Sequence, residues 1–218
     1  AVERIRAEVS SGTLIPAECN LASLESIRNF VQDLKLPQLD VVCYNAGLAL
    51  NAQGKDIQRT SDGFELTVGT NHLGHFYLNH LLLPKVNRDN GRIVVTASSV
   101  HDPESPGGKQ GKTASLGDLK GLERDGKNFE MVDGGSYDGD KAYKDSKLCN
   151  VLFTRELQRR LEASESTKNI VVNCFSPGLI TSSGFFRYQS PFFSKAFGFV
   201  AEKIAQVAET PEWGGGCL

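Results

Sequence analysis

The sequence alternates short β-branched runs with longer stretches of helical periodicity, and this alternation limits the possible folds more than any other feature. The runs at residues 39–44, 92–97 and 170–175 are rich in Val and Ile and end at turn-forming or small polar residues, as buried strands do. A fourth short strand is expected at 13–20. Consecutive apolar residues such as Val41-Val42 are typical of strands that are covered on both faces.

Helices are expected between these strands, because apolar residues recur there at intervals of three and four. One such stretch carries Leu24, Ile27, Val31 and Leu34 after Ser23, a candidate N-cap. The other expected helices span residues 1–9, 64–86 and 139–161. Strands that alternate with helices form a parallel sheet, so the expected fold class is α/β, a doubly wound parallel sheet.

Composition indicates a single globular domain over residues 1–218 and excludes several classes of function. The chain has 24 Lys and Arg against 26 Asp and Glu, a formal charge of −2, so its overall field does not favour nucleic acid. Its five cysteines include no Cys-x-x-Cys pair, and His72 and His75 have no acidic or cysteine ligands clustered around them, so no metal site is expected. No apolar run approaches the roughly 20 residues that span a bilayer.

Residues that follow each strand are the first candidates for a site, because ligands of doubly wound sheets lie beyond the carboxyl ends of the strands. In this sequence they are Asn20, Asn45-Ala46-Gly47, Ser98-Ser99 and Ser176-Pro177-Gly178.

Four polar residues form a candidate catalytic group. Tyr143 and Lys147 are four residues apart in an expected helix and therefore share a face. A tyrosine titrates near pKa ~10, and a neighbouring ammonium favours the phenolate, so we expect Lys147 to lower the pKa of Tyr143 and to enable acid–base chemistry. Ser98 could hydrogen-bond a substrate carbonyl, and Asn71, in the middle of an expected helix, could hold a water molecule.

These four residues, together with the Asn45-Ala46-Gly47 turn, resemble the catalytic tetrad and the Asn-Ala-Gly turn of the short-chain dehydrogenase/reductase family. The resemblance implies a Rossmann-like fold in which Tyr143 donates a proton, Lys147 also holds the nicotinamide ribose, Ser98 orients the substrate and Asn71 holds a relay water. It implies cofactor contacts at Asn20, Asn45, Ala46, Gly47, Lys147, Pro177, Gly178 and Ser182. The first strand and the glycine-rich loop of that family would precede residue 1, so we expect the sequence to be an internal piece of a longer protein.

A long inserted segment separates Ser98 from Tyr143. The two lie 45 positions apart, much farther than in most of that family, which places an inserted loop at about 101–138. Because this segment is rich in Gly and Lys and poor in periodic apolar residues, we expect a lid or substrate loop rather than core. With its flanks at 62–76 and 141–150, the insertion resembles the branch of the family that reduces a tetrapyrrole in the light. The resemblance implies NADPH as cofactor, a tetrapyrrole substrate and a plastid location, and it leaves open a peripheral association with plastid membranes and an oligomer.

Leu179 departs from that branch, which usually carries cysteine directly after Pro177-Gly178. A leucine cannot donate a proton. The sequence therefore leaves open a second interpretation, a reductase of carbonyl or retinoid-like compounds that works in the dark. A non-catalytic protein that binds NADPH is a third alternative, which the intact set of four catalytic residues disfavours.

Overall fold

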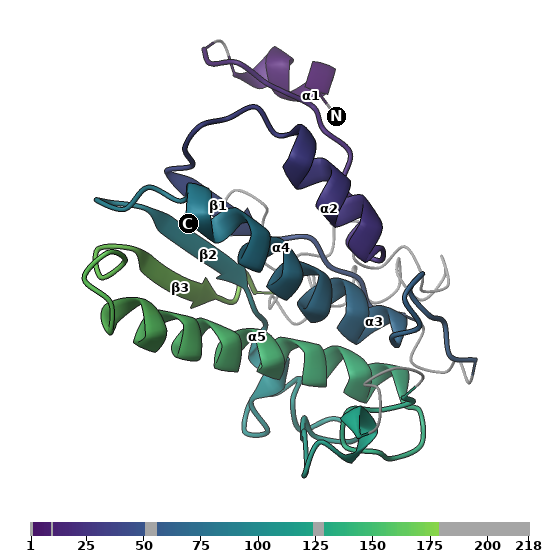
Figure 1. Cartoon of the computed structure of the whole chain (residues 1–218). Coiled ribbons are helices and arrows are strands. Elements are labelled where there is room, and N and C mark those ends of the chain that lie inside the picture. Colours follow the sequence, from purple (N-terminus) through teal and green to yellow (C-terminus); the bar gives the residue numbers. More distant parts are fainter. Residues whose placement is uncertain (1, 10, 51–55, 124–128, 179–218) are drawn as a thin grey trace.

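Three parallel strands form the sheet at the centre of the computed structural model, which describes residues 2–9, 11–50, 56–123 and 129–178 (Figure 1). The strands β1 (Val41–Tyr44), β2 (Arg92–Thr96) and β3 (Val171–Phe175) are hydrogen-bonded in the order β1-β2-β3. Val42 is in register with Ile93, and Ile93 with Val172. The predicted parallel α/β architecture is confirmed.

Helices connect the strands close to the predicted bounds. The α-helices are α1 (Val2–Glu8), α2 (Leu24–Asp33), α3 (Leu66–Val68), α4 (Gly74–Leu82) and α5 (Gly139–Glu162). A π-helical turn, η1 (Gly69–Leu73), and three 3₁₀ turns, η2 (Leu83–Lys85), η3 (Ser99–His101) and η4 (Lys120–Leu122), are the remaining elements of the described chain. Ser23 caps α2 as predicted, since its hydroxyl accepts a hydrogen bond from the Ser26 amide at 3.2 Å.

The expected helix at 64–86 is interrupted by the π-helical turn. It runs as α3, η1, α4 and η2 in direct succession, and η1 contains Asn71. A π-helical turn inside an α-helix frequently marks a functional position. Here it falls on one of the four candidate catalytic residues.

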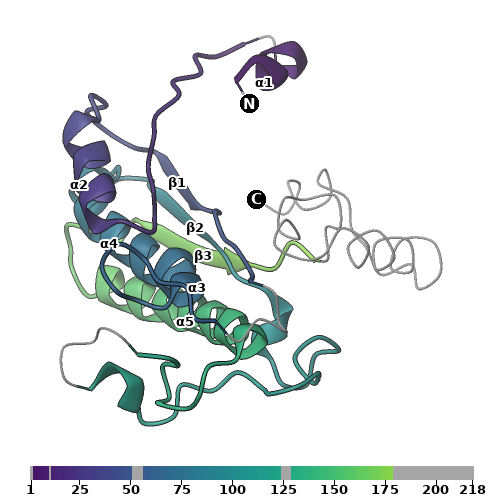
Figure 2. The ribbon, with the colours of Figure 1, turned by 90° about the vertical axis from the view of Figure 1, so that its right-hand side faces the viewer.

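The hydrophobic core lies between the sheet and α2, α4 and α5, which cover the same face of the strands (Figure 2). The strands contribute Val42, Ile93 and Val172 to it. The helices contribute Ile27, Leu78, Leu82, Leu157 and Leu161. Val42 is 9% exposed whereas the adjacent Val41 is 57% exposed, so the described helices bury only one of the two apolar faces that the sequence predicted to be covered.

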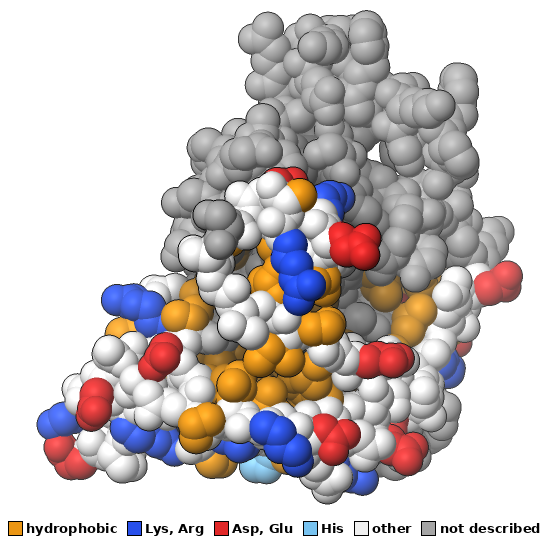
Figure 3. Space-filling view, turned by 90° about the horizontal axis from the view of Figure 1, so that it is seen from above, with side chains coloured by type: hydrophobic (Ala, Val, Ile, Leu, Met, Phe, Trp, Pro, Cys, Tyr) orange, Lys and Arg blue, Asp and Glu red, His pale blue; other side chains and the backbone are white. Residues whose placement is uncertain are grey.

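Several hydrophobic side chains remain on the surface of the described residues. Ile5, Val9, Ile15, Leu36 and Val41 are exposed. Figure 3 shows hydrophobic side chains gathered in the middle of the face seen from above. None of the helices in the described part of the chain combines the length and the hydrophobicity needed to traverse a bilayer.

The predicted strand at 13–20 is wrong. This segment is extended and largely exposed, with Ile15 at 69%, and it belongs to no strand of the described sheet. A strand exists only through hydrogen bonds to a neighbouring strand, and Pro16 has no amide to donate to one. Apolar pattern alone therefore could not make this segment a strand.

The inserted segment, residues 101–138, forms turns and η4 in its described parts, and it contains more core than expected. Phe129 and Val132 pack with Val68 of α3 in a second hydrophobic cluster, and Met131 is 1% exposed. The side chain of Arg59 fastens the same region by donating a hydrogen bond to the Phe129 carbonyl at 3.0 Å. The three apolar residues at 129–132 are followed directly by Asp133-Gly134-Gly135, so the run is too short to form a periodic pattern and the sequence indicated only a loop.

Candidate active site

The turns that follow the three strands are hydrogen-bonded to one another. Because the strands are parallel, their carboxyl ends lie at the same edge of the sheet. The Thr96 hydroxyl, at the end of β2, donates to Asn45 Oδ1 at 3.0 Å, and the Ser99 amide donates to the Ser176 hydroxyl at 3.1 Å. The candidate residues after β1, β2 and β3 thus form one edge of a site.

Asn71 joins the turn after β1 to α5. Its side chain is fully buried, accepts a hydrogen bond from the Leu48 amide at 2.9 Å and donates to the Leu48 carbonyl at 2.8 Å. It also donates to the Ser146 hydroxyl on α5 at 3.1 Å. A Cβ atom on Gly47 would lie 3.3 Å from Asn71 Oδ1 and 3.8 Å from Lys147 Nζ, so the absence of a side chain at Gly47 allows these groups to approach the turn.

Lys147 and Tyr143 face the same site from α5. Lys147 is 4% exposed, and its Nζ donates to the Thr96 carbonyl at 3.0 Å. The same nitrogen lies 5.6 Å from the centre of the Tyr143 ring. Tyr143 is half-buried and is hydrogen-bonded to Ser98, the residue that leads from β2 into η3. The structure therefore brings all four predicted catalytic residues together.

The expected direction of the pKa shift on Tyr143 is wrong. Burial raises the pKa of this phenol to about 12, and the hydrogen bond with Ser98 offsets only part of that rise. Burial also lowers the pKa of Lys147 to about 8. Burial removes water that would stabilise the charged form of each group, and this desolvation is the main cause of both shifts.

The sequence analysis missed several residues that support this group. Asn150 Oδ1 lies 3.1 Å from His72 Nδ1, and Asn150 Nδ2 donates a hydrogen bond to the Thr96 carbonyl at 3.3 Å. His75 Nδ1 lies 3.0 Å from the Asn71 carbonyl, and burial lowers the pKa of His75 to about 4. Asn150 lies three residues after Lys147, so helical spacing was the available signal for it.

The remaining predicted cofactor contacts lie in several parts of the chain, and not all of them are among the described residues. Asn20 is exposed, and its Oδ1 accepts from the Ala22 amide at 3.0 Å in the turn before α2. Pro177 and Gly178 follow β3, and Gly178 has a φ of +77°, a conformation that favours glycine. Ser182 lies outside the described residues, as does Leu179.

The residues present fit the sugar end of a nicotinamide cofactor. An ammonium has three protons, and the Thr96 carbonyl accepts one of those on Lys147. A Cβ atom on Gly47 would lie 3.8 Å from Lys147 Nζ and would fill the space beside it, so the glycine keeps that space open. A cationic donor next to an open backbone turn can hydrogen-bond the hydroxyl groups of a ribose.

Replacing Asn71 with alanine is expected to destabilise the fold by about 2 kcal/mol or more, because it leaves buried partners without hydrogen bonds. The orphaned groups would be the Leu48 amide and carbonyl and the Ser146 hydroxyl. Urea unfolding of the full-length protein measures the loss of stability. The control is N90A, because Asn90 is exposed. Equal midpoints for the two variants would show that the Asn71 contacts do not hold the turn.

Comparison with known proteins agrees with this geometry. The family model for short chain dehydrogenase matches residues 1–110, half of the chain. The chain is 38% identical over 213 residues to the chloroplastic protochlorophyllide reductase of Cucumis sativus, covering 88% of this chain and 52% of that protein. It is 39% identical over 214 residues to the corresponding protein of Daucus carota, covering 88% and 53%. The chain thus spans about half the length of these curated relatives.

Solved structures support the same fold. A short chain dehydrogenase family protein of Francisella tularensis superposes with a TM-score of 0.61 at 17% identity, covering 94% of this chain and 75% of that one. A short chain dehydrogenase of Shigella flexneri complexed with NADP gives a TM-score of 0.58 at 18% identity, covering 97% and 72%. The matched family model, the parallel sheet and the grouped site residues lead to one assignment: the chain belongs to the short-chain dehydrogenase family.

Proposed function

We propose that the protein containing this chain uses NADPH to reduce protochlorophyllide in the light, within the plastid. The observation that carries this proposal is the grouping of four residues at the carboxyl edge of the sheet: Tyr143 contacts Lys147 and Ser98, and Asn71 lies with Lys147 beside Gly47. The relatives named protochlorophyllide reductase, all chloroplastic, support the choice of substrate and location.

NADPH, when bound, would supply a hydride to one pyrrole double bond of the pigment. Lys147, Gly47 and the Asn45 turn would hold its ribose end, and Pro177-Gly178 would lie beside its nicotinamide end. The finer assignment of Asn20 and Ser182 as cofactor contacts belongs to the same proposal.

Tyr143 would supply the proton that completes the reduction. With a pKa raised to about 12, its phenol holds that proton throughout the neutral range. The hydrogen bond with Ser98 fixes the hydroxyl in place, and Asn71 holds the turn after β1 against α5. The site therefore stores a proton on a fixed donor, and the tyrosinate left after transfer is reprotonated from solvent.

A light-minus-dark assay on the full-length protein with NADPH and protochlorophyllide tests the proposal. We expect conversion to chlorophyllide only after illumination. The change in the pigment's absorption spectrum measures this conversion. Turnover of a carbonyl substrate in darkness, without pigment conversion in light, would instead support the reductase that the sequence left open. NADPH binding without either reaction would instead support the non-catalytic protein that binds NADPH.

A further inference from the structure

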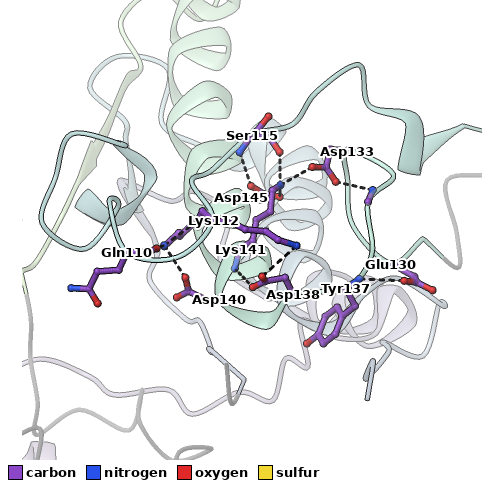
Figure 4. A network of polar contacts seen from close by, with 12 residues as sticks. Gln110, Lys112, Ser115, Glu130, Asp133, Tyr137, Asp138, Asp140, Lys141 and Asp145 are labelled. Atoms are coloured by element: carbon purple, nitrogen blue, oxygen red, sulfur yellow. Dashed lines mark hydrogen bonds and ion pairs between the residues drawn. The ribbon is translucent and has the colours of Figure 1, made fainter. Parts of the chain in front are cut away.

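The inserted segment is fastened to α5 by two buried lysines, Lys141 and Lys144, which precede and follow Tyr143 in the sequence. Figure 4 shows the contacts of Lys141. Lys141 Nζ donates to the Ser115 carbonyl at 2.7 Å and forms ion pairs with Asp145 at 2.6 Å and Asp133 at 3.0 Å. The side chain of Lys141 is 8% exposed and that of Asp145 is fully buried. One lysine thus contacts the inserted segment at two points 18 positions apart in the chain.

Asp145 and Lys144 add further attachments. Asp145 Oδ1 accepts a hydrogen bond from the Ser115 amide at 2.9 Å, so Ser115 is held at both its amide and its carbonyl. Lys144, whose side chain is 2% exposed, pairs with Asp140 at 2.7 Å. Its Nζ also donates to the carbonyl groups of Gln110 and Lys112, the latter at 3.1 Å.

Burying these charges is costly unless their geometry and hydrogen bonds are close to ideal. An apolar contact would hold the segment with less loss of hydration, but it would not fix the register of the backbone. Here the lysine nitrogens contact backbone carbonyls, and such bonds are directional. The arrangement is suited to setting the position of the segment.

Both ends of the inserted segment lead directly to catalytic residues. At its start, His101 Nδ1 lies 2.5 Å from the Ser98 carbonyl. At its end, Asp138 caps α5 by accepting a hydrogen bond from the Lys141 amide at 3.0 Å, five residues before Tyr143. A shift of the segment would therefore move Ser98 and Tyr143 relative to each other.

We infer that Lys141 is a positioning residue, which holds the inserted segment as a fixed side of the substrate pocket through Asp145, Asp133 and Ser115, and that Lys144 assists it. This role rests on the proposed function, because the pocket in question is the proposed pigment site beside Tyr143 and Ser98. The segment acts on the pigment and not on NADPH, whose proposed contacts come from the strand ends and Lys147.

The test compares K141M with K109M in the full-length protein. Lys109 lies in the same segment, but its ion pair with Glu104 is exposed, with side chains at 59% and 82%. We expect K141M to speed amide hydrogen exchange in residues 110–123 and 129–135 by about tenfold or more, since local opening controls exchange. The KM for the pigment should rise by a similar factor while the KM for NADPH stays within about twofold. K109M should match the unmodified protein in all three measurements.

D133N provides a second variant that leaves the Lys141–Asp145 pair intact, so it keeps the test decisive if K141M does not fold. It should give the same pattern at smaller amplitude. Exchange and KM values equal to those of K109M would overturn the inference, and so would faster exchange with an unchanged KM for the pigment. If the unmodified protein converts no pigment in light, the proposed function fails, whereas the exchange difference still decides whether Lys141 fastens the segment.

Discussion

Replacing Tyr143 with phenylalanine is expected to reduce turnover by about 10²–10⁴-fold, the usual contribution of a positioned proton donor. Phenylalanine keeps the ring beside Lys147 but removes the hydroxyl that is hydrogen-bonded to Ser98. The KM for NADPH should change by no more than about twofold, because a group that acts in the chemical step contributes little to ground-state binding. Steady-state kinetics under illumination, with both substrates varied, measure both effects.

Y137F is the matched control for this experiment. Tyr137 is also half-buried, and burial raises its pKa to about 12, but it lies before the first turn of α5 and outside the group of four. We expect Y137F to retain its activity. An equal loss in the two variants, or an unchanged rate in Y143F, would place the source of the proton elsewhere.

Replacing Lys147 with methionine is expected to stabilise the ligand-free protein while removing its activity. Burial lowers the pKa of Lys147 from 10.5 to about 8, so at pH 7 the folded state carries a buried charge at a cost. Removing this charge is expected to raise the free energy of unfolding of the variant by about 1–3 kcal/mol. The Thr96 carbonyl keeps Asn150 Nδ2 as a partner at 3.3 Å, so the substitution leaves no buried acceptor unpaired. The KM for NADPH should rise and kcat should fall, each by about tenfold or more, because the ribose loses its donor.

The stability of K147M relative to the unmodified protein is expected to change with pH in a defined direction. Between pH 8 and 10.5 the unfolded chain binds more protons at this lysine than the folded protein does, so the stability of the unmodified protein rises with pH across that window. The advantage of K147M should therefore be largest below pH 8 and should disappear near pH 10.5. Thermal unfolding at several pH values measures it, with K168M as the control because the Lys168–Glu165 pair is exposed. A K147M protein that is less stable at pH 7 would contradict the account.

The sequence predicted most of the fold because the packed elements carry strong periodic patterns. The strand ending at Tyr44 and the long helix that contains Tyr143 appear within about two residues of their predicted bounds. The segment 13–20 failed because pairing with a neighbour, which is not a local property, decides whether an extended segment is a strand. The cluster of Phe129 and Val132 was missed because its partner, Val68, is distant in the chain.

The candidate catalytic residues could be predicted because Ser98 follows a strand, Tyr143 and Lys147 have helical spacing, and Asn71 interrupts an expected helix. The direction of the pKa shift on Tyr143 could not be predicted, since burial is its main cause and burial is not visible in the sequence. The buried pair of Lys141 and Asp145 likewise has the i,i+4 spacing of an ordinary surface pair. Only the packing of the inserted segment over Lys141 and Asp145 distinguishes this buried pair from a surface pair.

A crystal structure of the full-length protein with NADPH tests the central claim most directly. We predict that Lys147 Nζ lies within about 3.2 Å of the nicotinamide ribose, with the open face of the nicotinamide turned toward Tyr143 and Ser98. A cofactor bound away from this edge of the sheet, or one with its adenine end beside Tyr143, would contradict the account.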